Sequence, residues 1–109
     1  MRSSTKKLTL TIATISAVVT LGGVALIAFS HYSNWSAERK ARAFCEAIPI
    51  GSAISSASAR AENEKVRWGS ENRYYRFFFP GAFLDKGVCD VDVDEHGVVV
   101  RKASSMVYD

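Results

Sequence analysis

The chain has 109 residues, which leaves room for one small folded domain. It carries 14 Lys and Arg residues against 11 Asp and Glu residues, and Arg2, Lys6 and Lys7 account for the basic excess, so the rest of the chain is formally neutral. A nucleic-acid-binding domain would concentrate basic residues on its folded part, so this charge distribution argues against nucleic acid as a partner.

An uncharged apolar segment covers residues 8–29, directly after the basic N-terminal residues. A helix of that length extends about 33 Å, enough to cross a hydrocarbon core of about 30 Å. We therefore expect residues 1–7 to be a cytoplasmic N-terminus, residues 8–29 a transmembrane anchor in the lipid bilayer, and residues 30–109 a small extracytoplasmic domain. The basic N-terminus favours this direction, although Arg39, Lys40 and Arg42 follow the anchor closely enough to weaken the bias.

A cleavable signal peptide is the alternative interpretation of the same segment. Ala28, Phe29 and Ser30 match the small-x-small pattern that precedes a cleavage site, and cleavage after Ser30 would release a secreted domain. The apolar segment is longer than the 7 to 15 residues or so of a typical signal peptide, which favours the uncleaved anchor. No cysteine lies at the end of the segment to accept a lipid, which argues against a lipoprotein.

The two cysteines, Cys45 and Cys89, show neither CxxC nor metal-ligand spacing. Outside the cytoplasm, such a pair in a small domain predicts a disulfide, which would stabilise the domain by about 4 kcal/mol in the chain-entropy model. If the topology were inverted, the same residues would be two buried free thiols of a cytosolic domain.

Two helices are predicted after the anchor. The first covers Ser33 to Ile48, with a cap at Ser33, Asn34 or Ser36 and a stop at Pro49. The second starts at Gly51 with Ser52 as its N-cap and reaches about Glu62. Their apolar faces consist of Ala37, Ala41, Phe44 and Ile48 in the first helix and of Ile54, Ala57 and Ala61 in the second.

Strand patterns follow from residue 65 onwards. The expected strands are Val66–Trp68, Arg73–Phe79, Val88–Asp94 and Val98–Tyr108, separated by a turn at Gly69–Asn72, a break at Pro80-Gly81 and a turn at Glu95–Gly97. In the third of these, alternation directs Cys89, Val91 and Val93 inward and the three aspartates outward. The sequence thus predicts an α+β protein: an N-terminal transmembrane helix, then two helices packed on a three- to four-stranded antiparallel sheet.

The aromatic run around residues 74–79 holds more large side chains than one face of a strand can bury. We therefore expect a partner-binding surface formed by Tyr75, Phe77, Phe78, Phe79 and Phe83. The alternative is that a loop or helix covers the second face of the sheet, since aromatic residues also favour strands.

The sequence assembles no catalytic or metal-binding constellation. The aspartates at 90, 92 and 94 resemble the start of a calcium loop, but Glu95 and Arg101 occupy the positions that require Gly and Glu. The only histidines are His31, at the end of the apolar segment, and His96, in a predicted turn, and no nucleophile lies in a recognisable elbow. We expect no enzymatic activity, no cofactor and no metal. Arg39, Lys40 and Arg42 are interpreted as a solvated helix face, with anionic lipid headgroups as the alternative.

The pattern Phe44-Cys45-x-x-Ile48-x-x-Gly51-x-x-Ile54, followed by Phe79-x-Gly81-x-Phe83, Cys89-x-Val91 and Gly97-x-Val99, resembles small single-pass membrane-anchored proteins of unassigned function from Gram-negative bacteria. This resemblance implies a two-cysteine fold and an envelope location. The Ile-x-x-Gly-x-x-Ile element is also similar, more loosely, to the small outer-membrane assembly lipoprotein family, from which the chain departs by lacking a lipidation cysteine.

These observations together predict a non-catalytic interaction module, anchored in the inner membrane with its domain in the periplasm and another envelope protein as its partner. The alternatives are a thiol/disulfide redox or other enzyme that uses Cys45 and Cys89, and a secreted domain released by signal cleavage.

Overall fold

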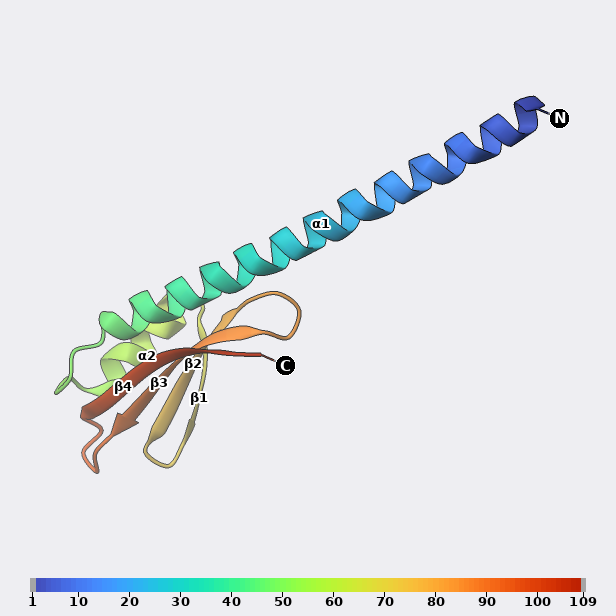
Figure 1. The fold of residues 1–109 in the computed structure, drawn as a ribbon. Helices are drawn as coiled ribbons and strands as arrows, with labels where there is room; N and C mark the ends of the chain where they lie inside the picture. Colours follow the sequence, from blue (N-terminus) through green and yellow to red (C-terminus); the bar gives the residue numbers. More distant parts are fainter. Residues whose placement is uncertain (1, 109) are drawn as a thin grey trace.

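The fold is α+β, as the sequence predicts, and is described here for residues 2–108 of a computed structural model, with side chains from residue 7 onwards. A long helix, α1 (Arg2–Glu46), is followed by a short helix, α2 (Ile54–Asn63). Four strands complete the chain: β1 (Arg67–Glu71), β2 (Tyr74–Pro80), β3 (Lys86–Val93) and β4 (Val99–Val107). They form one antiparallel sheet in the order β1-β2-β3-β4 (Figure 1).

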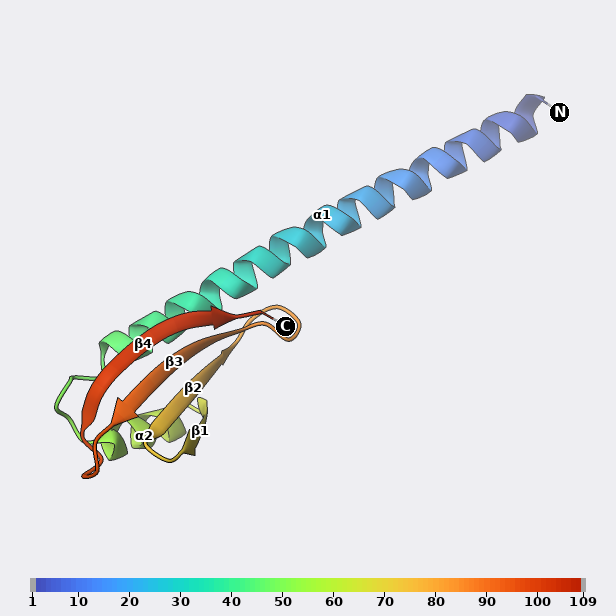
Figure 2. The same cartoon turned by 60° about the horizontal axis from the view of Figure 1, so that its bottom comes forward.

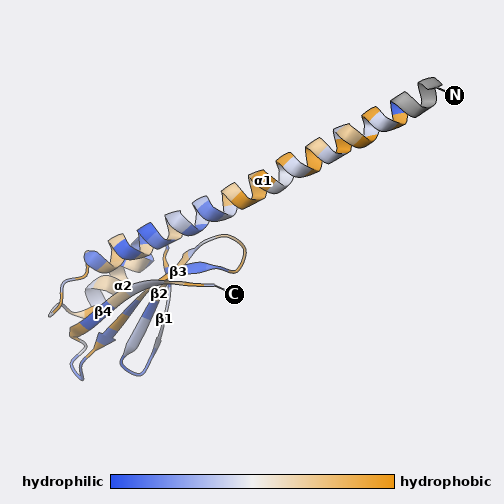
Figure 3. Cartoon of the chain, in the orientation of Figure 1, coloured by the Kyte–Doolittle hydropathy of each residue, from blue (hydrophilic) through white to orange (hydrophobic). Residues whose placement is uncertain are grey.

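Helix α1 is continuous across the point where the sequence suggested a separate helix. The prediction that a new helix begins near Ser33 is wrong, because α1 runs without a break from Arg2 to Glu46. Neither proline nor glycine occurs between residues 24 and 46, so nothing interrupts the backbone hydrogen bonds. From Lys7 onwards α1 is long and apolar enough to cross a membrane, and Figure 3 shows where its apolar residues lie. The side chains of residues 7–29 are exposed.

Two other predicted boundaries are also wrong. Ser52 is not the N-cap of α2: the cap position is Ala53, and the Ser52 hydroxyl donates to the Pro49 carbonyl oxygen at 2.6 Å. The predicted turn at Gly69–Asn72 begins too early, because β1 includes Gly69 and the chain turns at Asn72, whose φ is 59°. Asparagine tolerates this left-handed conformation, so it displaces the turn from the glycine.

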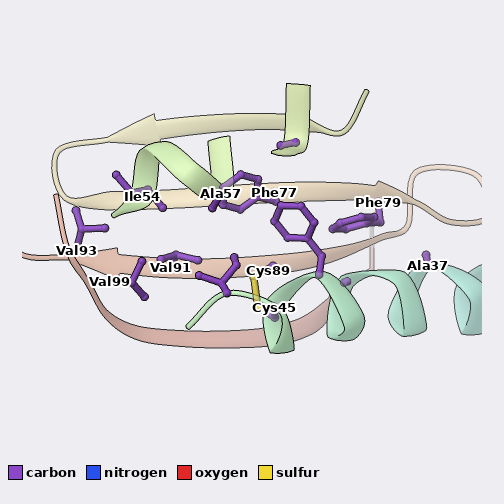
Figure 4. Packing of buried hydrophobic residues seen from close by; sticks show 14 residues of the cluster. Ala37, Cys45, Ile54, Ala57, Phe77, Phe79, Cys89, Val91, Val93 and Val99 are labelled. Carbon is purple, nitrogen blue, oxygen red and sulfur yellow. A yellow bond between two sulfur atoms is a disulfide. The ribbon is translucent and has the colours of Figure 1, made fainter. Parts of the chain in front are cut away.

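The hydrophobic core includes residues of both helices and of strands β2, β3 and β4 (Figure 4). Phe44 of α1 contacts Phe77 and Phe79 of β2, with ring centroids 4.8 and 5.6 Å apart. The predicted alternation in β3 is confirmed, since Cys89, Val91 and Val93 are buried. A bulge between Asp92 and Val93 marks the end of this regular pairing.

The predicted disulfide is present and joins α1 to β3. Cys45 and Cys89 are bonded, with their Cα atoms 5.5 Å apart, and Figure 4 shows the bond inside the core. Two residues before Cys89, Gly87 lies directly against the Ala37 backbone of α1. The absence of a side chain at position 87 therefore lets the helix approach the sheet closely.

Candidate functional site

An open groove of about 1200 Å³ lies beside the edge strand β1, between α1, the end of α2 and the loop that joins β2 to β3. Its lining is mainly aromatic and aliphatic, with basic residues around it. The lining residues are Lys40, Ala43, Phe44, Arg60, Glu64, Lys65, Val66, Arg67, Trp68, Phe78, Phe79, Pro80, Phe83, Leu84, Asp85 and Lys86. Since these residues come from five separate segments, only the folded chain assembles the groove.

The apolar part of the groove is an extension of the core. Phe44 and Phe79 are buried and contact each other, and the guanidinium of Arg60 lies over the Phe44 ring at 4.8 Å from its centroid. Trp68, which is partly buried, stacks on Tyr75 with ring centroids 5.9 Å apart. These contacts pack the aromatic side chains against one another in the free chain, so an apolar ligand would find a preformed site.

Basic residues outnumber acidic residues in the groove by five to two. Arg60 is paired with Glu64 at 3.4 Å, and the Lys86 ammonium lies 5.6 Å from the centroid of the Phe78 ring. The other three cations, Lys40, Lys65 and Arg67, form no ion pair with any residue between 2 and 108 that the structure describes. The groove therefore presents positive charge that the chain itself does not neutralise.

Two groove residues have a backbone conformation that non-glycine residues rarely adopt. Lys65 has a φ of 58° and Phe83 a φ of 54°, and neither residue type is favoured in the left-handed region. At Lys65 the conformation closes the C-terminal end of α2, since the Val66 N–H donates to the Ala61 carbonyl oxygen at 2.7 Å. Conformations of this kind cost of order 1–3 kcal/mol and concentrate at functional sites.

The five aromatic residues expected to bind a partner do not form one surface. Phe77 is fully buried and Tyr75 packs against the core, so both stabilise the domain. Phe78 and Phe79 line the groove from adjacent positions of β2, and Phe83 is 82% exposed in the β2–β3 loop. Sequence alternation assigns faces within a strand, but it does not show that a loop brings Phe83 next to Phe78 and Phe79.

The sequence did not decide whether the basic residues of α1 face solvent or lipid headgroups. In the structure, Arg39, Lys40 and Arg42 have three different surroundings. Arg39 lies over the Trp35 ring, 4.6 Å from its centroid, and Arg42 donates to Glu38 at 2.9 Å. Lys40 alone lines the groove. Sequence reasoning did not identify Lys40, Lys65 or Arg67 as parts of one site, since they lie in different elements.

On the outer face of the sheet, by contrast, two aspartates of β3 are paired with arginines. The carboxylate of Asp90 accepts hydrogen bonds from Tyr74 at 2.5 Å and from Arg76 at 2.7 Å, and Asp92 accepts one from Arg101 at 2.8 Å. Burial and the Asp90 contact raise the pKa of Tyr74, and the same carboxylate raises the pKa of Arg76. These aspartates face away from the core, as predicted, and are already neutralised by arginine.

Asp94 organises the turn between β3 and β4. Its Oδ1 atom accepts hydrogen bonds from the N–H groups of Val98 at 2.9 Å and of His96 at 2.8 Å. These two hydrogen bonds, that of Val98 first, hold the pKa of Asp94 below its ordinary value. Gly97 has a φ of 75°, which confirms the predicted role of glycine in this turn.

No protein-family model, curated protein or solved structure matches the chain. The resemblance to small membrane-anchored proteins of Gram-negative bacteria thus stays a prediction from the sequence.

Proposed function

We propose that this chain is a membrane-anchored interaction module without catalytic activity. Residues 8–29 anchor it in the inner membrane, with the N-terminus in the cytoplasm and residues 30–109 in the periplasm. There the groove binds an acidic, apolar segment of another envelope protein. The observation that carries this proposal is an aromatic groove bordered by Lys40, Lys65 and Arg67, three cations that form no ion pair with the described residues.

The chemistry of the groove supports this choice of ligand. Burying aromatic and aliphatic side chains of a partner would supply hydrophobic free energy at about 25 cal/mol per Å². Acidic side chains of the same segment would then pair with Lys40, Lys65 and Arg67, which gives orientation and specificity. A purely apolar segment would leave these cations unpaired, and a basic one would be repelled.

The proposed orientation of the chain follows from two features. Basic residues precede the apolar part of α1, which favours a cytoplasmic N-terminus. The disulfide between Cys45 and Cys89 supports a domain outside the cytoplasm, because disulfides persist mainly in oxidising compartments.

A redox enzyme that uses the cysteines is the second class of function. Such an enzyme needs a thiol that a substrate can reach. Cys45 is 4% exposed and Cys89 is fully buried, with both sulfur atoms bonded inside the core. This burial favours a structural disulfide and hence the interaction module.

Binding of short fluorescent peptides to the full-length chain in lipid nanodiscs tests the proposal. One peptide alternates Phe and Leu with Glu, and the matched peptide carries Lys in place of every Glu. We expect the acidic peptide alone to bind and to change the fluorescence of Trp68. The double variant Lys65→Glu, Arg67→Glu should weaken this binding by at least about tenfold, which corresponds to 1.4 kcal/mol.

The control for charge alone is Arg73→Glu, since Arg73 is exposed in the turn between β1 and β2 and lies outside the groove. It should leave the affinity within about twofold of the wild type. Equal binding of both peptides, or an equal loss of affinity in the groove and control variants, would disprove the proposed groove function.

A further inference from the structure

The side chain of Asn34 in α1 holds the loop between β2 and β3, residues 81–85. The Asn34 amide donates to the Asp85 carboxylate at 3.0 Å, and its carbonyl oxygen accepts from the Ala82 N–H at 2.8 Å. Within the loop, the Gly81 N–H donates to the Asp85 carbonyl oxygen at 2.9 Å. These hydrogen bonds set the height of the loop along the axis of α1.

The position of the β2–β3 loop along α1 is close to the end of the apolar part of this helix. Asn34 follows Phe29 by five positions, which is about 7.5 Å along a helix axis. The headgroup layer on each side of a bilayer is about 5 to 8 Å thick, from the difference between its total and hydrocarbon thicknesses. The loop lies beside the stretch of α1 where polar residues give way to apolar ones (Figure 3).

The tip of this loop consists of two large apolar residues that the domain does not bury. Phe83 is 82% exposed and Leu84 is 73% exposed. Nearby on α1, the exposed rings of Tyr32 and Trp35 contact each other, with centroids 6.2 Å apart. Aromatic residues of this kind are enriched where a transmembrane segment meets the headgroups.

The two ends of the sheet differ in polarity. The end toward the anchor carries the β2–β3 loop and, next to the paired residues Lys86 and Val107, the exposed Tyr108 (Figure 2). The opposite end carries the turns at residues 72–73 and 94–97, which are polar or charged except for Gly97. Among the loops that join consecutive strands, the exposed large apolar residues thus lie at the end that faces the anchor, while Ile50 and Val100 are exposed near the opposite end.

We infer that the loop tip formed by Phe83 and Leu84 inserts into the headgroup layer of the same bilayer that α1 crosses. This inference rests on the membrane anchor of the proposed function. The domain is then held against the membrane surface at two places, the anchor and the loop. Because Phe83 and Leu84 also line the groove, the groove opens beside the lipid headgroups.

A nitroxide label at Leu84→Cys, in the full-length chain reconstituted into vesicles of phosphatidylcholine and phosphatidylglycerol, tests this inference. Both native cysteines are in the disulfide, so the introduced thiol is the reactive one among residues 2–108. The matched control is Val100→Cys, at the opposite end of the sheet and 53% exposed. Collision of each label with a water-soluble nickel complex and with lipid-soluble oxygen is measured by electron paramagnetic resonance.

We expect the Leu84 label to collide several-fold less with nickel than the Val100 label and several-fold more with oxygen. The chains are reconstituted at far fewer than one per vesicle on average, so that protection by a second copy is negligible. Equal nickel accessibility at both positions in chains that float with the vesicles would overturn this inference and leave the anchor intact. Failure of the chain to float with vesicles would overturn the anchor and this inference together.

Discussion

Substituting Gly87 by alanine should separate α1 from the sheet. A Cβ atom at this position would overlap the carbonyl oxygen of Ala37 and lie 2.8 Å from its carbonyl carbon and 3.2 Å from the Ala41 Cβ. Ordinary carbon contacts lie at about 3.5 to 4.0 Å, so α1 must retreat by about 1 Å. The overlapping atoms belong to the backbone, so no change of rotamer relieves the clash, and the disulfide two residues further on opposes the movement. We expect Gly87→Ala to lower the free energy of unfolding by about 1–3 kcal/mol.

Urea unfolding of the full-length chain in non-ionic micelles, followed by tryptophan fluorescence, measures this loss. The control is Gly69→Ala in β1, where an added Cβ meets no atom within 4 Å. That variant should be neutral or more stable by up to about 1 kcal/mol, since alanine loses less backbone entropy than glycine on folding. Equal unfolding midpoints for the two variants would refute the close approach of α1 to β3.

Three further outcomes are expected from the same unfolding assay. Replacing Cys45 and Cys89 together by alanine should cost about 4 kcal/mol by the loop-entropy model, and an unchanged midpoint would show that the disulfide is absent from the native protein. The hydrogen bonds of the β3–β4 turn lower the pKa of Asp94. The charged carboxylate of Asp94 therefore stabilises the domain above the ordinary carboxyl pKa of about 3.9, and this contribution is lost as the pH falls through the folded-state pKa. Asp94→Asn, whose amide oxygen still accepts the hydrogen bonds, should therefore lose less stability than the wild type between about pH 5 and pH 2, and an equal loss would contradict this role. Phe77→Ala should cost about 3–5 kcal/mol, whereas Leu84→Ser should stay within about 0.5 kcal/mol, and similar costs would contradict the burial of the first and the exposure of the second.

The parts of the fold that could be predicted depend on short-range patterns. Alternation in residues 88–94 identified the inward face of β3, because side chains of a strand alternate between its two faces. The same pattern directed Cys89 toward the core, and Cys45, its partner, directly follows Phe44 of the predicted apolar helix face. Glycine at position 97 marked a turn that requires a positive φ.

The groove and the helix continuity could not be predicted in this way. Asn34 has the chemistry of a helix cap, but its side chain bonds the β2–β3 loop, a partner about fifty residues away in the sequence. Lys40 and Arg67 become neighbours of one groove only when α1 and β1 take their places in the fold. Phe83 adopts a left-handed conformation that its residue type disfavours, so no local preference indicates it.

The unbroken course of α1 gives the domain no hinge at the membrane. The helix that would cross the bilayer is the same helix whose Cys45 is covalently joined to Cys89 in the middle of the sheet. A rotation of the transmembrane part about its own axis would therefore carry the sheet and the groove with it, and a tilt would raise or lower them together. A partner anchored in the same membrane would meet the groove at a height set by the tilt of α1. A membrane protein that bound α1 within the bilayer could therefore turn the groove without contacting the folded domain.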